Sequence, residues 1–131
     1  MQVKRRRHKS LLNIADKCYY CERNFNSDGY LNAGRKTIDH IVPLSKNGLD
    51  QKENVVICCQ WCNDMKGNLS LNQFFKKIKE VKKTGSVMPI EQLNLIQNNI
   101  INLRKNEDYQ WVKRFSEKKQ KPPHQIRTET Q

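Results

Sequence analysis

Residues 18–21 read CYYC and residues 59–62 read CQWC, so one Cys-x-x-Cys spacing occurs twice, on either side of a long intervening segment. At this spacing two thiolates can bind one ion from a tight turn, and two such pairs supply the four ligands of tetrahedral zinc. A redox dithiol would require only one pair. We therefore predict a structural Zn²⁺ site made of four side chains: Cys18, Cys21, Cys59 and Cys62.

The composition explains why such a site would be needed. Only 36% of the residues are hydrophobic, so the core is expected to be small. Small cores usually need a disulfide or a metal, and structural zinc can contribute roughly 10 kcal/mol of folding free energy. The cysteine count is odd and no secretory signal is visible, which argues against a disulfide framework. Cys58 is predicted to be a buried packing residue, because using it as a ligand in place of Cys59 would break the x-x spacing.

The segment between the two cysteine pairs has the pattern of a hairpin. Residues 37–42, TIDHIV, are rich in β-branched side chains and run into Pro43, which predicts a strand followed by a turn. Residues 54–58, NVVIC, form a second short apolar run. From about Gln60 the pattern becomes helical, and Gly67 stands where a helix would end. The order strand, strand, helix is therefore expected here.

Helices are predicted for the part of the chain that follows. Ser70 and Gln73 form a capping-box pattern, and the helix after them would end at residues 84–86, TGS. Its apolar face contains Leu71, Phe74, Phe75, Ile78 and Val81, and its lysines Lys76, Lys77, Lys79, Lys82 and Lys83 lie elsewhere. A further helix begins near Pro89 and carries Leu93, Ile96, Ile100 and Leu103. We expect it to pack back on the domain, with a dimer face as the alternative.

The chain resembles the HNH endonuclease family over residues 18–67. The resemblance rests on the two cysteine pairs together with IDHIVPLS at residues 38–45, EN at residues 53–54, and CQWCNDMKG at residues 59–67, all in the family's order. It implies an α+β fold with a ββα-metal (His-Me finger) core, stapled here by the four-cysteine zinc site and followed by C-terminal helices.

The resemblance also implies the roles of four site residues. Asp39 would bind a catalytic divalent cation, His40 would be the general base, Asn54 would hold the loop and orient His40, and Asn63 would be the second cation ligand. The family name has His at the last position, and the amide oxygen of Asn suits Mg²⁺ or Mn²⁺ better than an imidazole does. Because adjacent strand residues point to opposite faces, Asp39 and His40 can face one ion only if the strand bends or bulges.

The charge of the chain predicts its partner. Lys and Arg number 25 against 13 Asp and Glu, a formal net charge of +12, which favours DNA over an anionic membrane surface. The residues expected to contact phosphate are Lys4, Arg5, Arg6, Arg7 and Lys66, and a solvated surface is the alternative for each. No apolar run is long enough to span a bilayer, so a cytoplasmic location in a bacterial or phage-infected cell is expected.

The expected organisation has four parts: a basic disordered arm at 1–9, the nuclease domain at 10–84, a helical extension at 85–116, and a disordered tail at 117–131. The expected function is hydrolysis of DNA phosphodiesters, nicking or cutting to 5′-phosphate and 3′-hydroxyl ends. One alternative is a non-catalytic, zinc-stabilised nucleic-acid-binding module, and another is a zinc-dependent protein-interaction domain. The sequence leaves open the role (phage packaging, homing or restriction), a monomer or a homodimer, and a second protein that supplies specificity.

Overall fold

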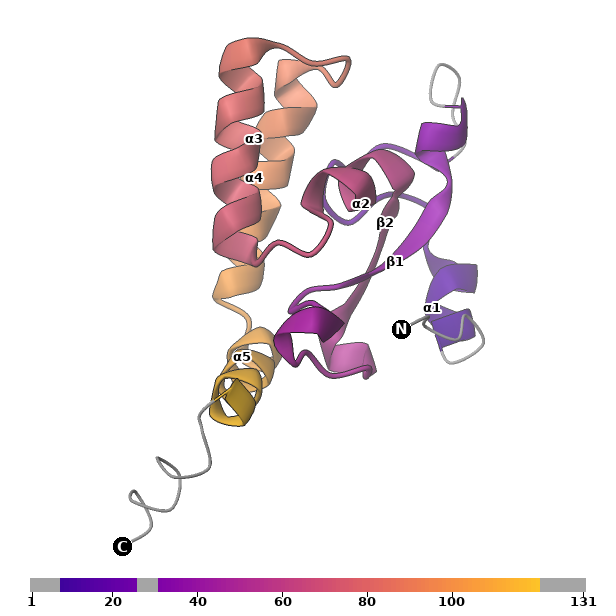
Figure 1. Ribbon diagram of the computed structural model, residues 1–131. Coiled ribbons are helices and arrows are strands. Elements are labelled where there is room, and N and C mark those ends of the chain that lie inside the picture. The colour runs from indigo at the N-terminus through magenta and orange to yellow at the C-terminus, as the bar shows by residue number, and fades with distance from the viewer. Residues whose placement is uncertain (1–7, 26–30, 121–131) are drawn as a thin grey trace, which may run out of the picture.

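A two-stranded hairpin followed at once by a short helix forms the centre of the molecule (Figure 1). The computed structural model describes residues 8–25 and 31–120. Strand β1 (Lys36–His40) pairs antiparallel with β2 (Val55–Cys59), in a register that runs from Lys36 opposite Cys59 to His40 opposite Val55. Helix α2 (Gln60–Lys66) starts at the residue after β2. The predicted strand–strand–helix order is confirmed, with strand ends shifted by one or two residues.

Two glycines shape the backbone near the site, one at the end of α2 and one in the hairpin loop. Gly67 ends α2 with a φ of +50°, a backbone conformation that favours glycine, and its N–H donates to the Asn63 carbonyl at 2.8 Å. Gly48 lies in the hairpin loop between the 3-10 helices η3 (Leu44–Lys46) and η4 (Lys52–Asn54). A Cβ on Gly48 would lie 1.8 Å from the Val42 carbonyl oxygen, so only glycine allows this close approach.

The two faces of the hairpin pack against different elements. On one face Val56 and Cys58 join the main core, which includes the cysteine pairs and residues of α3 and α4. On the other face Val55 and Ile57 pack with Leu12 of helix α1 (Lys9–Ile14) in a smaller cluster. This division follows from the two-residue period of a strand, and it places neighbouring residues of β1 in different surroundings.

Helices α3 (Leu71–Thr84) and α4 (Ile90–Arg104) lie side by side at one edge of the molecule (Figure 1). The predicted capping box is present, because the Ser70 hydroxyl accepts from the Gln73 N–H and the Gln73 side chain accepts from the Ser70 N–H. The apolar side chains of α4 are buried in the main core, as expected for a helix packed back on the domain: Leu93, Ile96, Ile100 and Leu103. The alternative in which this face forms a dimer is therefore wrong.

Helix α5 (Glu107–Gln120) corrects the boundary of the predicted tail, because residues 117–120 are helical and not disordered. Tyr109, Val112 and Ser116 recur at helical spacing and are buried, and α5 packs against η4. The buried face therefore gives this polar segment a reason to be ordered. The remaining tail, residues 121–131, lies outside the described residues.

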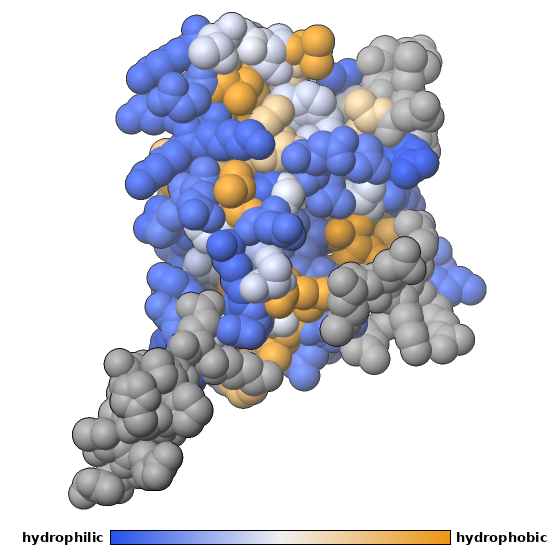
Figure 2. Space-filling model, viewed as in Figure 1, coloured by the Kyte–Doolittle hydropathy of each residue, from blue (hydrophilic) through white to orange (hydrophobic). Residues whose placement is uncertain are grey.

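The N-terminal boundary also differs from the prediction. Helix α1 begins at Lys9, and His8 is buried at its N-terminus, so the last two residues of the expected arm are ordered. Predicted phosphate contacts at Lys4, Arg5, Arg6 and Arg7 lie outside the described residues. None of the helices in residues 8–25 and 31–120 has the length and apolarity needed to cross a bilayer. Figure 2 shows hydrophilic side chains gathered over the α3 edge, where most of its lysines are exposed.

Candidate metal and catalytic site

The four predicted zinc ligands lie together in the core. The Sγ atoms of Cys18, Cys21, Cys59 and Cys62 are all within 4.8 Å of one another, and all four side chains are fully buried. Within each pair the N–H of the second cysteine donates to the sulfur of the first at 3.4 Å, which stabilises a thiolate. Four buried sulfurs without disulfide bonds therefore form a site positioned to bind a metal ion, and its donor set suits zinc.

Each cysteine pair is held by backbone hydrogen bonds to its surroundings. The first pair turns through Glu22, which has a φ of 65°, and its Tyr19 N–H donates to the Ile57 carbonyl at 3.0 Å, which joins it to β2. The second pair lies at the junction of β2 and α2, where Cys59 is the N-cap. Cys58 takes no part in this cluster, because its buried side chain lies 3.5 Å from the Thr37 hydroxyl, in agreement with the packing role predicted for it.

The carboxylate of Asp39 is buried between two hydrogen-bond donors. The Tyr20 hydroxyl donates to Oδ2 at 2.7 Å, and the Lys66 ammonium donates to Oδ1 at 3.1 Å. Burial raises the pKa of Asp39, while the positive charge of Lys66 and the hydrogen bonds from Tyr20 and Lys66 act in the opposite direction. These contacts offset part of the cost of a charged group in a buried site.

Lys66 does not lie where the predicted phosphate contact requires. Its side chain is 0% exposed, and its ammonium donates to the carbonyl of His40 at 3.0 Å as well as to Asp39. The sequence contains a signal for this position, because Lys66 follows Asn63 by three residues and therefore lies on the same face of α2. The prediction was that Lys66 contacts phosphate, with a solvated position as the alternative, and both require an exposed ammonium. The buried carboxylate of Asp39 opposite it is the physical reason for the difference.

His40 is held by an aspartate that the sequence analysis missed. The Nε2 atom of His40 lies 2.9 Å from Asp50 Oδ1, and the Nε2 atom of His8 lies 2.7 Å from the same oxygen. Burial acts to raise the pKa of Asp50, but the hydrogen bonds from both histidines lower it overall. An ionised carboxylate only accepts, so Nε2 of His40 carries the proton and Nδ1 is left with its lone pair.

Asn54 holds the loop, as the prediction states, through three hydrogen bonds to backbone atoms. Its Oδ1 accepts from the Val42 N–H at 2.9 Å, and its Nδ2 donates to the carbonyls of Val42 at 2.9 Å and Leu49 at 2.8 Å. The side chain is completely buried. These bonds fix the segment that contains Asp50, so any effect of Asn54 on His40 passes through the loop.

Asp39, His40 and Asn63 line one open cavity of about 310 Å³ next to Pro43 and Gly67. The amide nitrogen of Asn63 faces the Ile38 carbonyl at 3.4 Å, so the amide oxygen is the atom that this contact leaves for a cation. Three of the four residues that were assigned to the catalytic site therefore lie around a common space, and Asn54 is not among them.

The expected bulge is not found in β1, whose five residues pair with β2 in unbroken register. Asp39 contacts Tyr20 and Lys66 in the main core, whereas His40 contacts Asp50 on the side of α1. Both nevertheless reach the cavity, because β1 ends at His40 and the cavity lies at that end of the strand. Asp39 and His40 can therefore both line the cavity because they lie at the end of the strand, without the bend that we expected.

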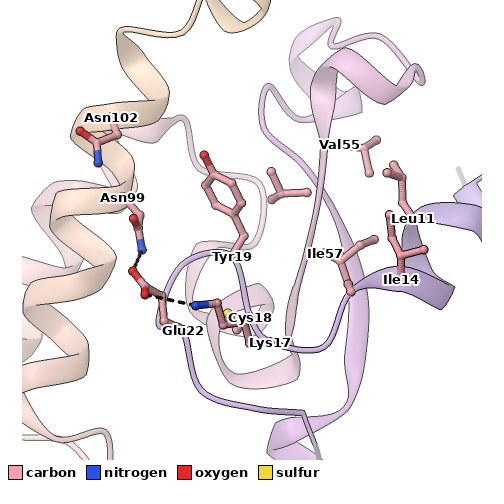
Figure 3. A pocket seen from close by; sticks show the side chains of 12 residues that line it. Leu11, Ile14, Lys17, Cys18, Tyr19, Glu22, Val55, Ile57, Asn99 and Asn102 are labelled. Carbon is pink, nitrogen blue, oxygen red and sulfur yellow. Dashed lines mark hydrogen bonds and ion pairs between the residues drawn. The ribbon is translucent and has the colours of Figure 1, made fainter.

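A larger cavity of about 580 Å³ lies elsewhere, between α1, the first cysteine pair, β2 and α4 (Figure 3). Its lining is mostly apolar, with side chains such as Leu11, Ile14 and Ile57. Its one carboxylate, Glu22, is already paired with Lys17 at 3.7 Å and with the Asn99 amide at 3.0 Å, as Figure 3 shows. The smaller cavity therefore holds the residues with catalytic potential.

The chain has the arrangement of the ββα-metal class of proteins: a hairpin, a helix that follows it, and oxygen donors on β1 and α2 that line one cavity. In agreement, residues 18–69 match the family model described as HNH endonuclease. Over residues 18–69, less than half of its length, the chain is thus similar to the HNH endonuclease family, whose members are generally metal-dependent nucleases. No curated protein matches the chain significantly. The matched segment contains both cysteine pairs and the whole cavity but ends before α3, and it begins after His8.

Proposed function

We propose that the protein is a DNA endonuclease that hydrolyses phosphodiester bonds, with His40 as the general base and a divalent cation bound by Asp39 and Asn63. The observation that carries the proposal is the cavity that Asp39, His40 and Asn63 all line. One of these residues, His40, is held by Asp50, which favours the tautomer with the proton on Nε2. A nucleic-acid-binding module without catalysis would not need a histidine held in this way.

His40 can accept the proton of an attacking water. Because Nε2–H donates to Asp50, the lone pair of Nδ1 is available as the base, and the imidazolium formed would be stabilised by the Asp50 carboxylate. Water oxygen attacks phosphorus, its proton passes to Nδ1, and the bond between phosphorus and O3′ breaks. The products are a 5′-phosphate and, after protonation of the departing oxygen, a 3′-hydroxyl.

Asp39 and Asn63 suit a hard cation such as Mg²⁺ or Mn²⁺, because one carboxylate and one amide oxygen are hard ligands and few in number. When bound, the cation would polarise the phosphate and stabilise the departing oxygen. The Lys66 ammonium donates to the Asp39 carboxylate and favours its ionised form, while burial raises the pKa of Asp39 overall. A cation bound by Asp39 would share that carboxylate with the Lys66 ammonium.

The four-cysteine cluster is proposed to hold Zn²⁺ as a structural ion. It joins the first cysteine pair to the junction of β2 and α2, on which Asn63 depends for its position. The cation at Asp39 and the ion at the cysteines would therefore have separate tasks, one catalytic and one structural.

DNA is the proposed substrate because the chain carries a net charge of +12 and its α3 lysines are largely exposed. Binding should weaken steeply as salt rises, since each phosphate contact releases counterions. Phosphate contacts at residues 4–7, nicking by a monomer, a partner that supplies specificity, a cytoplasmic location and a phage or mobile-element role are further parts of this proposal.

The decisive experiment is a plasmid-nicking assay with Mg²⁺ or Mn²⁺ on the wild type and on His40→Ala. The wild type is expected to nick, and His40→Ala should lose about 10² to 10⁴ in rate, the usual contribution of general-base catalysis. His124→Ala, a histidine outside the described residues, is the matched control. Both variants should keep DNA binding and zinc content. Equal rates for wild type and His40→Ala would favour the binding module.

A further inference from the structure

Two histidines and one aspartate converge beside the proposed catalytic cavity. Nε2 of His8 lies 2.7 Å and Nε2 of His40 lies 2.9 Å from the same atom, Asp50 Oδ1. The three donor groups all lie within 4.8 Å of one another, and the two imidazoles meet edge to face with centroids 6.1 Å apart. His8 comes from outside the segment that matches the HNH model.

The donor set differs from that of the proposed catalytic cation. Two imidazole nitrogens and one carboxylate oxygen suit Zn²⁺, Co²⁺ or Ni²⁺, whereas Asp39 and Asn63 offer oxygens alone. Two ligands of a tetrahedral ion with bonds of about 2.1 Å are about 3.4 Å apart, so the nitrogens and the oxygen would spread by roughly 0.5–0.7 Å from the hydrogen-bond distances of 2.7 and 2.9 Å. The histidines are buried, but Asp50 is 25% exposed, which gives an ion a path from solvent.

We propose that His8, His40 and Asp50 form a second metal site, selective for a transition metal such as Zn²⁺, and that its occupation inhibits the nuclease. The inhibitory part rests on the proposed function. The ion would be bound by the lone pair of Nε2 on both histidines, and the single proton of the neutral His40 ring would then be on Nδ1.

Occupation of the site would remove the base. A neutral imidazole bound to a metal through Nε2 carries its one proton on Nδ1. Nδ1 of His40 would therefore lose the lone pair that must accept the proton of water. His8 would thus connect a segment outside the HNH domain to the state of the catalytic histidine.

The first test measures metal binding and needs no activity. The full chain carrying one Zn²⁺ in its cysteine site is titrated with Zn²⁺ by calorimetry and with Co²⁺ by visible absorption. The wild type should bind a second ion, His8→Ala should bind it at least tenfold more weakly, and His124→Ala should match the wild type. A single ion per wild-type chain, or an unchanged second site in His8→Ala, overturns the proposal.

The fold of His8→Ala can be checked independently. The His8 side chain makes no capping hydrogen bond to α1, so its truncation should not disturb the helix, and retention of the first Zn²⁺ together with the circular dichroism spectrum verifies this. A second variant, His8→Asn, keeps a polar side chain of similar reach but is a poor ligand for Zn²⁺. It should lose the second ion as His8→Ala does, and retention of that ion would overturn the assignment.

The second test adds Zn²⁺ to the Mg²⁺-dependent nicking assay. The zinc concentration that halves the wild-type rate should match the dissociation constant of the second ion, and it should rise at least tenfold in His8→Ala. Equal inhibition of the two proteins would mean that zinc acts at Asp39 and Asn63 instead, which overturns the inhibitory role. If the wild-type protein does not nick DNA at all, both the proposed function and the inhibitory role of the second metal ion are overturned. Calorimetry then still tests whether His8, His40 and Asp50 bind that ion.

Discussion

The ammonium of Lys66 lies 3.1 Å from Oδ1 of Asp39, and the two side chains are 0% and 3% exposed. An ion pair so completely removed from water connects the last turn of α2 to β1, the two elements that enclose the cavity. Loss of one partner leaves the other as an unpaired buried charge, which is strongly unfavourable.

Lys66→Met should therefore lower the free energy of unfolding by about 3–5 kcal/mol, because the Asp39 carboxylate is left unpaired. Urea denaturation at pH 7, with zinc in the cysteine site, measures the change. The double variant Asp39→Asn/Lys66→Met should recover part of the loss. Lys76→Met, at an exposed position of α3, is the control and should change stability by less than about 0.5 kcal/mol. A loss at Lys66 no larger than at Lys76 would contradict the prediction.

Tyr20→Phe should shift the pH dependence of nicking. Burial already raises the pKa of Asp39, and the Tyr20 hydroxyl opposes this by donating to the carboxylate. Without that bond the pKa of Asp39 rises further, and the ionised form needed for cation binding appears only at higher pH. The acidic limb of the profile of kcat/KM should therefore move to higher pH. Tyr19→Phe, whose side chain is 40% exposed, should leave it in place.

Asp50→Asn should lower kcat and leave KM for DNA nearly unchanged. The amide can still contact His40, but it no longer stabilises an imidazolium or enforces the Nε2–H tautomer. A fall of about 10- to 100-fold is expected, smaller than that for His40→Ala. Single-turnover nicking measures the rate, and Asp64→Asn on the exposed side of α2 is the matched control. A rise in KM with kcat unchanged would place Asp50 in substrate binding instead.

Two neighbouring cysteines provide a sharp test of the zinc assignment. Cys59→Ala should abolish stoichiometric zinc binding and cooperative folding, because it removes one of four clustered ligands. Cys58→Ala, one residue away, should retain one Zn²⁺ per chain and lose about 1–2 kcal/mol of stability through packing alone. Elemental analysis and thermal unfolding distinguish the two. Zinc retained by Cys59→Ala and lost by Cys58→Ala would reverse the assignment.

The parts of the fold that depend on local signals could be predicted from the sequence. The β-branched runs of the hairpin, the capping box at Ser70 and the glycine after α2 each act within a few residues, and each was located correctly. Helix α5 was missed in part because its burial depends on η4, more than fifty residues earlier in the chain. A polar composition alone predicts disorder until the opposing surface is known.

The candidate site shows the same limit. Asp39, His40 and Asn63 were assigned from the resemblance to the HNH family, and the cysteines from their repeated spacing. Asp50 and His8 were missed because nothing in the spacing indicates that a loop and the start of α1 meet at the His40 ring. Lys66 was noted as a phosphate contact, but the sequence does not reveal which lysine is buried opposite a carboxylate.

The packing of α5 on η4 has a consequence for anyone who wishes to excise the catalytic unit. η4 ends at Asn54, the side chain that fixes the hairpin loop, and α5, which contains the buried Val112, packs against η4. A fragment cut at residue 69, where the family match stops, would expose this surface and the apolar residues beneath α4 to water. We therefore expect the smallest piece able to fold on its own to extend some fifty residues past the recognisable motif, to the end of α5.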